Sequence, residues 1–433
     1  MSFDAQMLRL DSVAQINPKR KVSKGDSVPF VDMAALLQHS RDISSGEVIT
    51  REAKGAGAHF QNGDTLLARI TPCLENGKTA QVRCLNGGAV GEGSTEFIVL
   101  CGIDPADNDF VYYLCRDPAF REYAIGRMEG TSGRQRVSWQ TIAAYEFICL
   151  GPLERRAAAQ VFSALDDRIT LLRETNATLE AIAQALFKSW FVDFDPVRAK
   201  MQGRAPEGMD EATAALFPDG LEESELGLVP RGWRIGTLAD LSDLNPESWS
   251  AKNHPDVVAY IDLANAKDNE IASVTDFTFA NAPSRARRVL RGGDTIVGTV
   301  RPGNRSFAFI HEPASNLTAS TGFAVLRPSA VANTEFVYLA ATQDSSIEHL
   351  AHVADGGAYP AVRPDVVSGL QSLVPAAFVL EAFHVAAAPL LAKVAENQAQ
   401  AQTLATLRDT LLPRLISGAL RLPQAEAMLE VAA

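Results

Sequence analysis

A weak internal repeat is the feature that most constrains the fold of this chain of 433 residues. Three blocks, GDTLLARITP (63–72), STEFIVL (94–100) and DFVYYL (109–114), return in the same order as GDTIVGTVRP (293–302), STGFAVL (320–326) and EFVYLA (335–340). Asn17-Pro18 also returns, as Asn245-Pro246, and the four offsets are 228, 230, 226 and 226 residues. A period this long is far longer than a solenoid repeat, so it predicts two copies of one domain.

Each copy begins with short β-type runs and continues into a helical region. Residues 66–70 and 295–300 are apolar runs that follow Gly-Asp turns, and residues 97–100 and 323–326 are similar. Such runs predict strands. We therefore expect an α+β fold in which two similar globular domains are separated by long helices.

The first helical region carries a heptad pattern. Leucines recur every seven residues, at Leu165, Leu172, Leu179 and Leu186, and the alternate seam positions are Ile169, Asn176, Ala183 and Trp190. This spacing predicts a coiled-coil helix from Leu153 to Phe191, about 55–60 Å long at 1.5 Å per residue. An amphipathic core helix is the alternative, but a helix of this length seldom packs within one small domain. A polar residue in the seam, here Asn176, costs stability and fixes register.

A second helical region, from about Ala377 to Ser417, has a looser seam that includes Leu404 and Leu411. Pro389 and Pro413 are expected to kink or bound it. Two long helices on one chain most simply pair with each other, so this region is predicted to be the partner of the first helix.

These patterns predict five segments along the chain. They are domain 1 (1–152), the first long helix (153–200), an acidic linker (201–232), domain 2 (233–376), and the second long helix with the C-terminal region (377–433). The linker is expected to lie outside any core, because residues 206–227 hold seven acidic residues, several Gly and Pro, and no Lys or Arg.

The formal net charge of −12 argues against a protein that coats nucleic acid or anionic membranes indiscriminately. Positive charge is nevertheless concentrated locally. Residues 285–305 contain six arginines against one Asp294, and the loop 126–139 carries Arg127, Arg134 and Arg136 among Gly, Ser and Thr. Composition alone favours solvated surface turns for such loops. The second copy places Arg301 and Arg305 at the same point of the repeat, however, which favours a binding role for both.

Known catalytic patterns are not completed. Gly77-Lys78-Thr79 resembles the end of a phosphate-binding P-loop, but Pro72 stands where the first Gly is required. The five cysteines form no CxxC pair and fit no zinc spacing, so they are expected to be free thiols in a reducing compartment. No run of 18 uninterrupted apolar residues and no basic-then-apolar N-terminus is present, which predicts a cytoplasmic protein without a membrane span.

Several longer blocks resemble the specificity subunits of type I restriction–modification systems. These blocks are ARITPCLENGK (68–78), EGSTEFIVL (92–100), GTSGRQRVSW (130–139), ALFKSWFVDFDPVR (185–198) and LRDTLLPRLISG (407–418). The resemblance implies that domains 1 and 2 are target-recognition domains, each reading one half of a split double-stranded DNA sequence. It also implies that the long helices form an antiparallel coiled coil that docks two modification (methyltransferase) subunits.

The same resemblance implies a non-catalytic role within a restriction endonuclease and adenine methyltransferase complex. Methyl transfer and cleavage would belong to the modification subunits and to restriction (translocase/nuclease) subunits. No cofactor is expected on this chain, and S-adenosylmethionine is expected on the modification subunit. The loop GTSGRQRVSW is replaced by GGAYPAVRPD (356–365) in the second copy, so the two halves are expected to read different sequences.

The candidate site residues are polar and basic residues of loops in each copy, together with the seam of the helices. The predicted DNA-binding residues are Arg69, Thr71, Asn76, Lys78, Arg134 and Arg136 in domain 1, and Thr299, Arg301, Asn304, Arg305 and Tyr359 in domain 2. The predicted subunit and coiled-coil interface is Leu165, Leu172, Asn176, Leu179, Leu186, Leu404 and Leu411. No metal site is expected. Two alternatives from other classes remain, a stand-alone DNA-modifying enzyme and a coiled-coil scaffold for protein partners.

Overall fold

The computed structural model describes residues 6–38, 40–131, 133–225 and 227–432. The chain divides into two compact units. Unit 1 contains the residues up to Arg173 and those from Gln400 onward, and unit 2 contains Glu174–Ala399. The first five residues, which bear on the expectation about the N-terminus, lie outside the described residues.

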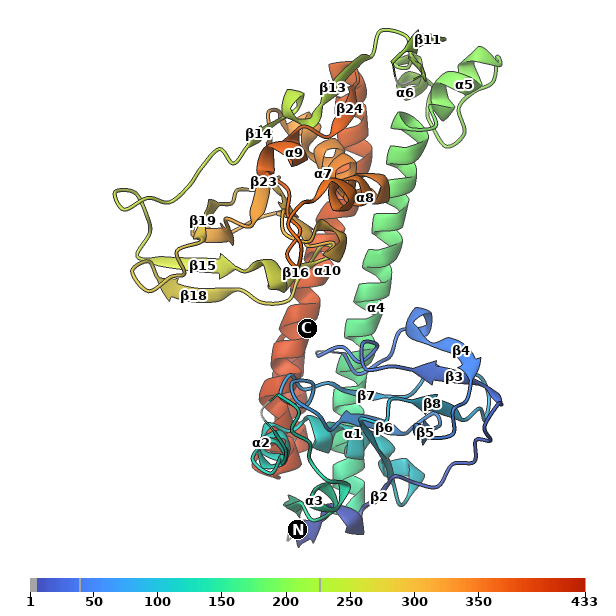
Figure 1. Cartoon of the computed structure of the whole chain (residues 1–433), viewed down its shortest axis with the longest axis vertical. Coiled ribbons are helices and arrows are strands. Elements are labelled where there is room, and N and C mark those ends of the chain that lie inside the picture. The colour runs from blue at the N-terminus through green and yellow to red at the C-terminus, as the bar shows by residue number, and fades with distance from the viewer. Residues whose placement is uncertain (1–5, 39, 132, 226, 433) are drawn as a thin grey trace. The chain divides into compact units, whose positions relative to one another are not determined.

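Unit 1 contains two four-stranded sheets and one two-stranded sheet (Figure 1). The first sheet has the order β2-β9-β6-β7, with β2 (Ala14–Ile16), β9 (Phe97–Gly102), β6 (Thr65–Ala68) and β7 (Thr79–Gln81). The second has the order β4-β3-β8-β5, with β4 (Ile49–Glu52), β3 (Ser27–Val31), β8 (Gly91–Gly93) and β5 (Ala58–Phe60). The short sheet pairs β1 (Gln6–Arg9) with β10 (Glu146–Cys149). Only β3 and β8 pair in parallel among these strands of the described chain.

Unit 2 repeats this topology strand for strand. The first sheet has the order β14-β23-β20-β21, with β14 (Ser242–Leu244), β23 (Phe323–Pro328), β20 (Thr295–Gly298) and β21 (Phe307–Phe309). The second has the order β18-β15-β22-β19, with β18 (Thr275–Thr278), β15 (Val257–Ile261), β22 (Leu317–Ser320) and β19 (Ala286–Val289). The pair β13 (Arg234–Thr237) and β24 (Gln371–Val374) matches β1 and β10. The prediction of two copies of one domain is confirmed.

Two hairpins occur in unit 2 without a counterpart among the described strands of unit 1. They are β11 (Leu221–Ser224) with β12 (Gly227–Pro230), and β16 (Ala266–Lys267) with β17 (Glu270–Ile271).

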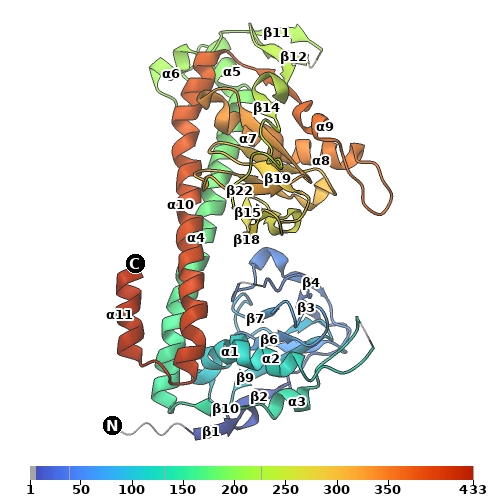
Figure 2. The same ribbon diagram turned by 90° about the vertical axis from the view of Figure 1, so that its left-hand side faces the viewer.

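The helices also correspond between the copies (Figure 2). In unit 1 they are α1 (Asn108–Arg116), α2 (Pro118–Ile125) and α3 (Trp139–Ala143), and in unit 2 they are α7 (Thr334–Thr342), α8 (Asp344–Val353) and α9 (Pro364–Ser368). The remaining short helices are α5 (Asp195–Met201), α6 (Glu211–Ala215) and α11 (Leu422–Ala432). The 3₁₀ turns are Leu10–Ser12, Ser45–Glu47, Pro105–Asp107, Leu238–Asp240, Leu263–Asn265, Pro302–Asn304 and Val331–Asn333.

The repeated Gly-Asp turns have a clear structural cause. Gly63 and Gly293 have φ values of 91° and 85°, which favour glycine. The aspartates that follow, Asp64 and Asp294, are almost fully buried and are paired with arginines. Burial raises the pKa of the Asp64 carboxyl, although the hydrogen bonds from Arg20 act in the opposite direction.

The repeated asparagines are equally constrained. Asn17 and Asn245 both have φ 49°. The Asn17 Oδ1 accepts from the Val99 N–H at 3.0 Å, and the Asn245 Oδ1 accepts from the Val325 N–H at the same distance. Asparagine tolerates the left-handed region better than other side chains, and here its side chain also completes a strand edge. The repeat blocks are therefore largely requirements of the fold.

Two helices of 40 residues dominate the α-structure, α4 (Pro152–Phe191) and α10 (Ala377–Ile416). In unit 1 Leu172 packs in a cluster with Ala401, and Arg408 forms a buried ion pair with Asp166. Rising numbers on α4 therefore meet falling numbers on α10, as an antiparallel pair requires.

The same direction holds in unit 2. Asn176 bonds with Asn397, and the ring of Phe187 lies 6.2 Å from that of Phe383. The predicted antiparallel pairing of the two helices is thus confirmed in each unit.

The sequence predicted that Pro389 and Pro413 kink or bound the second helix, and the second of these outcomes is wrong. Pro389 and Pro413 both lie inside α10, which continues to Ile416. A proline inside a helix costs about 3 kcal/mol or more. Burial of neighbouring residues such as Leu391, Leu411 and Leu415 offsets this cost.

The acidic segment is also more ordered than its composition indicates. Phe217, in the middle of the predicted linker, is 2% exposed and packs edge-on against Trp190, with ring centroids 5.0 Å apart. The Lys200 ammonium donates to the Ala214 carbonyl at 3.2 Å. The expectation that this segment lies outside any core is therefore wrong, because Phe217 is part of the core and Met209, Leu216 and Leu221 pack against it, while the carboxylates face solvent.

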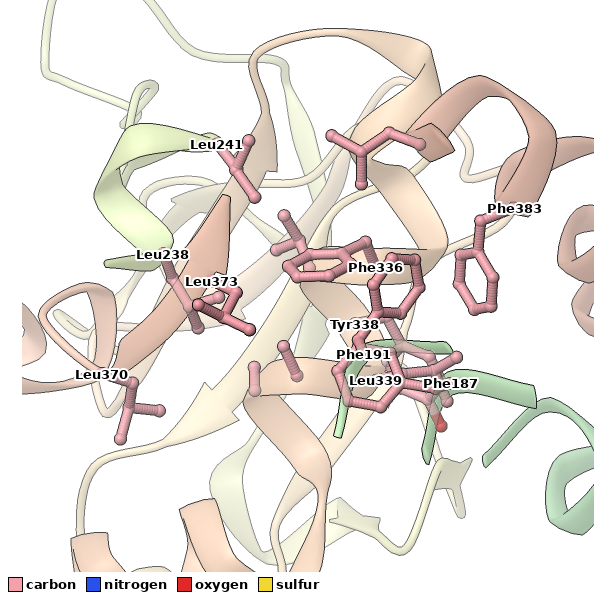
Figure 3. Packing of buried hydrophobic residues seen from close by; sticks show 14 of the residues in the cluster. Phe187, Phe191, Leu238, Leu241, Phe336, Tyr338, Leu339, Leu370, Leu373 and Phe383 are labelled. Carbon is pink, nitrogen blue, oxygen red and sulfur yellow. The ribbon is translucent and has the colours of Figure 1, made fainter. Parts of the chain in front are cut away.

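Aromatic side chains form the centre of the largest core cluster, which belongs to unit 2. Figure 3 shows Phe187 and Phe191 of α4 beside Phe336 of α7 and Phe383 of α10. Phe191 lies 4.9 Å from both Phe336 and Phe383, edge-on in each case. Such pairs add about 0.5–1.5 kcal/mol each beyond the burial of their area. The end of α4 is thereby fixed to domain 2.

Candidate nucleic-acid interface

In unit 1, the loop after α2 pairs with the turn that follows β6. The Thr71 N–H donates to the Gln135 carbonyl, and the Val137 N–H donates to the Arg69 carbonyl, both at 3.0 Å. Ile70 and Arg136 form an isolated antiparallel bridge between these segments. Two loops that lie far apart in sequence therefore form one surface. Ser132 of the predicted loop lies outside the described residues.

Unit 2 builds the same surface from the equivalent loops. The Arg301 N–H donates to the Pro360 carbonyl at 2.7 Å, and the Val362 N–H donates to the Thr299 carbonyl at 2.9 Å. These bonds align Pro360 with Gln135 and therefore place Tyr359 where Arg134 stands in the first copy. The predicted replacement of one loop by the other is confirmed by this geometry.

Of the six predicted DNA-binding residues of domain 1, two are exposed and two are held by hydrogen-bond partners within the domain. Asn76 and Arg134 are exposed. The Lys78 ammonium donates to the Met33 carbonyl at 2.8 Å. Arg136 donates to both carboxylate oxygens of Glu96, the closest contact being 2.6 Å. This ion pair lowers the pKa of the Glu96 carboxyl and anchors the loop to the sheet.

The remaining two predicted residues, Arg69 and Thr71, are neither exposed nor fully hydrogen-bonded. Both are partly buried, and the Arg69 Nε and the Thr71 Oγ1 are buried without a hydrogen-bond partner among the described residues. Unsatisfied donors of this kind are rare in folded proteins and indicate a position where an external acceptor is expected.

Domain 2 shows a similar division. Thr299 is buried, and its hydroxyl donates to the Gly322 carbonyl at 2.8 Å. Arg305 is held by Asp268 at 2.5 Å and by Asp344 at 2.7 Å. Asn304 is exposed.

Arg301 and Tyr359 form a pair at the tip of this surface. The Arg301 guanidinium donates to the Ala358 carbonyl at 2.7 Å and lies 4.6 Å from the centroid of the Tyr359 ring. Tyr359 is 70% exposed, an unusual position for a large aromatic side chain. The stacked arginine keeps donors free for a ligand while its orientation is fixed.

The predicted cluster of six arginines in 285–305 is not one basic patch. Arg285 pairs with Asp262 at 2.6 Å, and Arg291 pairs with Glu247 at 2.9 Å. The acids that neutralise these arginines lie outside the window in sequence and reach it through the sheets. The sequence charge of that window therefore overstates the positive surface of domain 2.

A basic pocket in domain 1 was not predicted from the sequence. It has a volume of about 580 Å³ and is lined by the Lys19-Arg20-Lys21 run, by His59 and by Arg69. The signal that could have revealed it is the run of three basic residues directly after the repeated Asn-Pro pair, which has no counterpart at 247–249.

The predicted helix seam is used within the chain. Leu165, Leu172, Asn176 and Leu411 are buried, whereas Leu179, Leu186 and Leu404 are partly buried. The seam therefore joins α4 to α10 in each unit, so a partner subunit would have to dock on other faces of these helices.

No metal site is apparent in the described part of the chain, where no three His, Cys, Asp or Glu side chains are grouped as a metal would require. The five cysteines are unpaired. Of the helices described, α10 alone is long and apolar enough to cross a membrane by length and composition, and 33% of its most apolar stretch is buried.

The chain thus belongs to a class of proteins with a duplicated α+β domain and an antiparallel pair of long helices. Each copy of the domain carries one surface formed by two loops. The chain is 26% identical to the type I restriction enzyme HindI specificity subunit of Haemophilus influenzae, over 90% of this chain and 94% of that protein. It is 23% identical to the MjaIX specificity subunit of Methanocaldococcus jannaschii, over 74% and 71%. The chain is therefore a relative of type I restriction enzyme specificity subunits, and the resemblance found in the sequence is confirmed.

Solved structures give similarity at lower sequence identity. The S subunit of a type I restriction–modification system from M. genitalium aligns over 96% of both chains with a TM-score of 0.49 and 14% identity. The HsdS subunit from Thermoanaerobacter tengcongensis aligns over 96% of this chain with a TM-score of 0.36 and 18% identity. No protein-family model matches the chain.

Proposed function

We propose that this chain is the DNA specificity subunit of a type I restriction–modification complex and reads a bipartite, asymmetric target. The observation that carries the proposal is the duplication of one surface with different tips, Arg134 in one copy and the Arg301–Tyr359 pair in the other. Two copies of a fold explain two half-sites, and unlike tips explain why the half-sites differ. The similarity to specificity subunits over nine-tenths of the chain supports the same function.

Each surface offers groups suited to double-stranded DNA. In domain 1, Asn76 and Arg134 are exposed and are the residues proposed to reach base edges. In domain 2, Asn304 and Arg301 have this role, with Tyr359 as an apolar face against a base or sugar. Arg136 and Arg305, which are held by carboxylates, are proposed to position the loops and contribute charge near phosphates.

The helices provide the docking surface in this proposal. Two modification subunits would bind the outer faces of α4 and α10, where Phe378 and Val385 of α10 are 50% and 74% exposed. Restriction subunits would join the complex through them. S-adenosylmethionine would be held by the modification subunits, because no cofactor motif was recognised in this sequence.

The decisive experiment maps modified bases in host DNA with and without the gene for this chain. Loss of one split, asymmetric motif supports the proposal, and an unchanged pattern contradicts it. Arg134→Ala and Tyr359→Ala then serve as matched variants. Each is expected to relax the sequence requirement in one half of the motif, and a different half for each variant.

Two measurements separate the alternatives. Binding of S-adenosylmethionine by the chain alone would favour a stand-alone DNA-modifying enzyme. Absence of salt-dependent duplex binding by the assembled complex would favour a coiled-coil scaffold, because every DNA-binding protein that neutralises phosphates shows such dependence.

A further inference from the structure

The basic pocket of domain 1 contains no carboxylate among its lining residues. Arg20 is neutralised by Asp64, to which it donates two hydrogen bonds, at 2.7 and 3.2 Å. Lys19 and Lys21 are exposed, and no described carboxylate lies within ion-pairing distance of either. The pocket is thus positively charged after its internal pairs are counted.

One further donor on the wall of the pocket lacks a partner. The Nε of Arg69 is buried without a hydrogen bond among the described residues, whereas His59 contacts the Arg20 carbonyl through Nδ1 at 3.3 Å and has its Nε2 3.7 Å from Glu92. Glu96 lies near Arg69, but both of its oxygens accept from Arg136. A buried guanidinium nitrogen without an acceptor costs free energy, so its retention calls for a ligand that supplies one.

The second copy shows that the fold does not require these groups. From the Asn17 and Asn245 alignment, Glu247 stands in the place of Lys19. Val289 pairs with Thr318 in the register in which His59 pairs with Glu92, so a valine replaces the histidine.

Arg69 and Lys21 are also replaced by residues without a positive charge in domain 2. Thr299 occupies the place of Arg69, since it accepts the equivalent backbone hydrogen bond from the loop. Trp249 stands where Lys21 stands in domain 1, and its indole N–H donates to the Thr318 hydroxyl at 2.8 Å. Four groups that line the pocket of domain 1 are therefore replaced together while the topology is kept, which separates them from the structural core.

Glu247, which replaces Lys19 in domain 2, has ion-pair partners within its own domain. Glu247 forms ion pairs with Arg291 and with Arg327. The acid at this point of domain 2 is thus paired with two arginines, while Arg288, which stands in the place of Ala58, is a basic residue that the second copy adds to the equivalent site. The first copy therefore has Lys19, Lys21 and Arg69 at this point, where the second has Glu247, Trp249 and Thr299.

The pocket adjoins the proposed reading surface of its own domain. Arg69 lines the pocket and also accepts, through its carbonyl, the hydrogen bond from Val137 that aligns the loop. A ligand that covers this loop passes the mouth of the pocket. The group that matches two lysines, an arginine and the Thr95 hydroxyl without any carboxylate is a phosphate.

We propose that this pocket holds a backbone phosphate of the DNA contacted by domain 1, and that domain 2 makes no equivalent contact. The assignment rests on the proposed function and adds to it an unequal division of phosphate contacts between the two half-sites. A free mononucleotide offers the same chemistry, so the experiment separates the two sources.

The test compares the full chain assembled with its modification subunits against the variant Lys19→Gln with Arg69→Gln. The slope of log Kd against log salt concentration is expected to fall by about 0.9 for each phosphate that the variant no longer neutralises. Kd rises for cognate and unrelated duplexes alike, because phosphate binding carries no sequence information. The matched control is Lys252→Gln, which removes one exposed lysine near the equivalent segment of domain 2 and leaves the slope unchanged.

A second variant, Lys19→Glu, introduces the residue found at the equivalent position of domain 2 and is expected to lower the slope further. Unchanged thermal unfolding of each variant shows that the fold is retained. Titration of the full chain with adenosine 5′-monophosphate is expected to show no binding that depends on Lys19.

Each outcome is decisive. If the parent complex binds DNA and the pocket variant has the same slope, the pocket assignment is overturned and the proposed function stands. Binding of the mononucleotide that disappears in the variant while the DNA slope is unchanged assigns the pocket to a free nucleotide and also overturns the proposal. If the parent complex binds no DNA at any salt concentration, the proposed function fails and the assignment fails with it.

Discussion

A buried ion pair fixes the helix pair to domain 1, and its removal gives the sharpest stability prediction. The side chains of Asp166 in α4 and Arg408 in α10 are each 3% exposed and bonded to one another. The Tyr113 hydroxyl of α1 donates to the other carboxylate oxygen of Asp166 at 2.7 Å. One carboxylate therefore joins three helices of unit 1.

Replacing Arg408 by Met removes the charge and keeps most of the side-chain volume. Asp166 then stays buried with one neutral donor, Tyr113. Breaking a buried pair by removing one partner costs about 3–5 kcal/mol, because the remaining charge has lost its compensation. The structure supports the upper part of this range, since so little of either side chain reaches solvent.

The assay is hydrogen exchange with mass spectrometry at increasing urea concentrations, because it reports on each unit of the chain separately. The free energy of exchange for peptides covering α1 and the end of α10 is expected to fall by about 3–5 kcal/mol. Peptides covering α7 in unit 2 provide the internal control and are expected to be unchanged.

A double variant tests the cause. Asp166→Leu together with Arg408→Met removes both charges, and apolar replacement of a buried pair is often neutral or stabilising. It is expected to recover most of the loss, less about 1 kcal/mol for the Tyr113 hydroxyl that loses its acceptor. A single variant that loses less than about 1 kcal/mol, or a double variant no better than the single one, would refute the reasoning.

Three other changes are predicted. Replacing Asn176 and Asn397 together by Leu is expected to raise the melting temperature of unit 2, measured by calorimetry, while weakening the register of the helix pair, measured by disulfide trapping of shifted pairs. Phe217→Ala is expected to cost about 3–5 kcal/mol in urea denaturation, as for a core position, and a loss below about 1 kcal/mol would show that the acidic segment is only peripheral. The pKa of Glu96 is lowered by Arg136, so the stability from this pair is present above the ordinary value of 4.5 and is lost as pH falls through the folded pKa. Protection factors of the loop amides, which divide out the intrinsic effect of pH on exchange, should therefore fall below pH 4.5, and Glu96→Gln should lower them at neutral pH as well.

Much of the fold could be predicted because the same local demands occur twice. The Gly-Asp turns need a residue with positive φ followed by a buried acid, and the Asn-Pro pairs need a left-handed asparagine. These requirements involve residues that are neighbours in sequence, so both copies have the same residues at these positions. The helix pair was equally visible, because a heptad depends on spacing within one element.

The partners of the charged side chains could not be predicted. Arg136 lies 40 residues from Glu96, and Arg305 lies 39 residues from Asp344, so no local pattern connects them. As a result, the sequence indicated the loops that form the paired surface of each copy but treated every arginine in them as free. The partner of Lys78 was hidden for the same reason, since its acceptor is a backbone carbonyl 45 residues away.

The charge beside the two-loop surface of each copy depends on which segment supplies the arginine that pairs with a buried aspartate. Each copy buries an aspartate after its glycine turn, and each such carboxylate needs an arginine. Domain 1 supplies Arg20 from the segment after the Asn-Pro pair, whereas domain 2 supplies Arg327 from β23, at the position where domain 1 has Cys101.

This exchange alters the surroundings as well as the pair. Arg327 lies close enough to bind Glu247 in addition to Asp294, so the segment after the second Asn-Pro pair can carry an acid. In domain 1 the arginine comes from that segment itself, and its two lysine neighbours have no acid to bind. A single demand of the fold is therefore met by Arg20 of a loop in one copy and by Arg327 of β23 in the other, which leaves a basic pocket in the first copy and an acid, Glu247, at the equivalent position of the second. The net charge of the whole chain contains no trace of this difference.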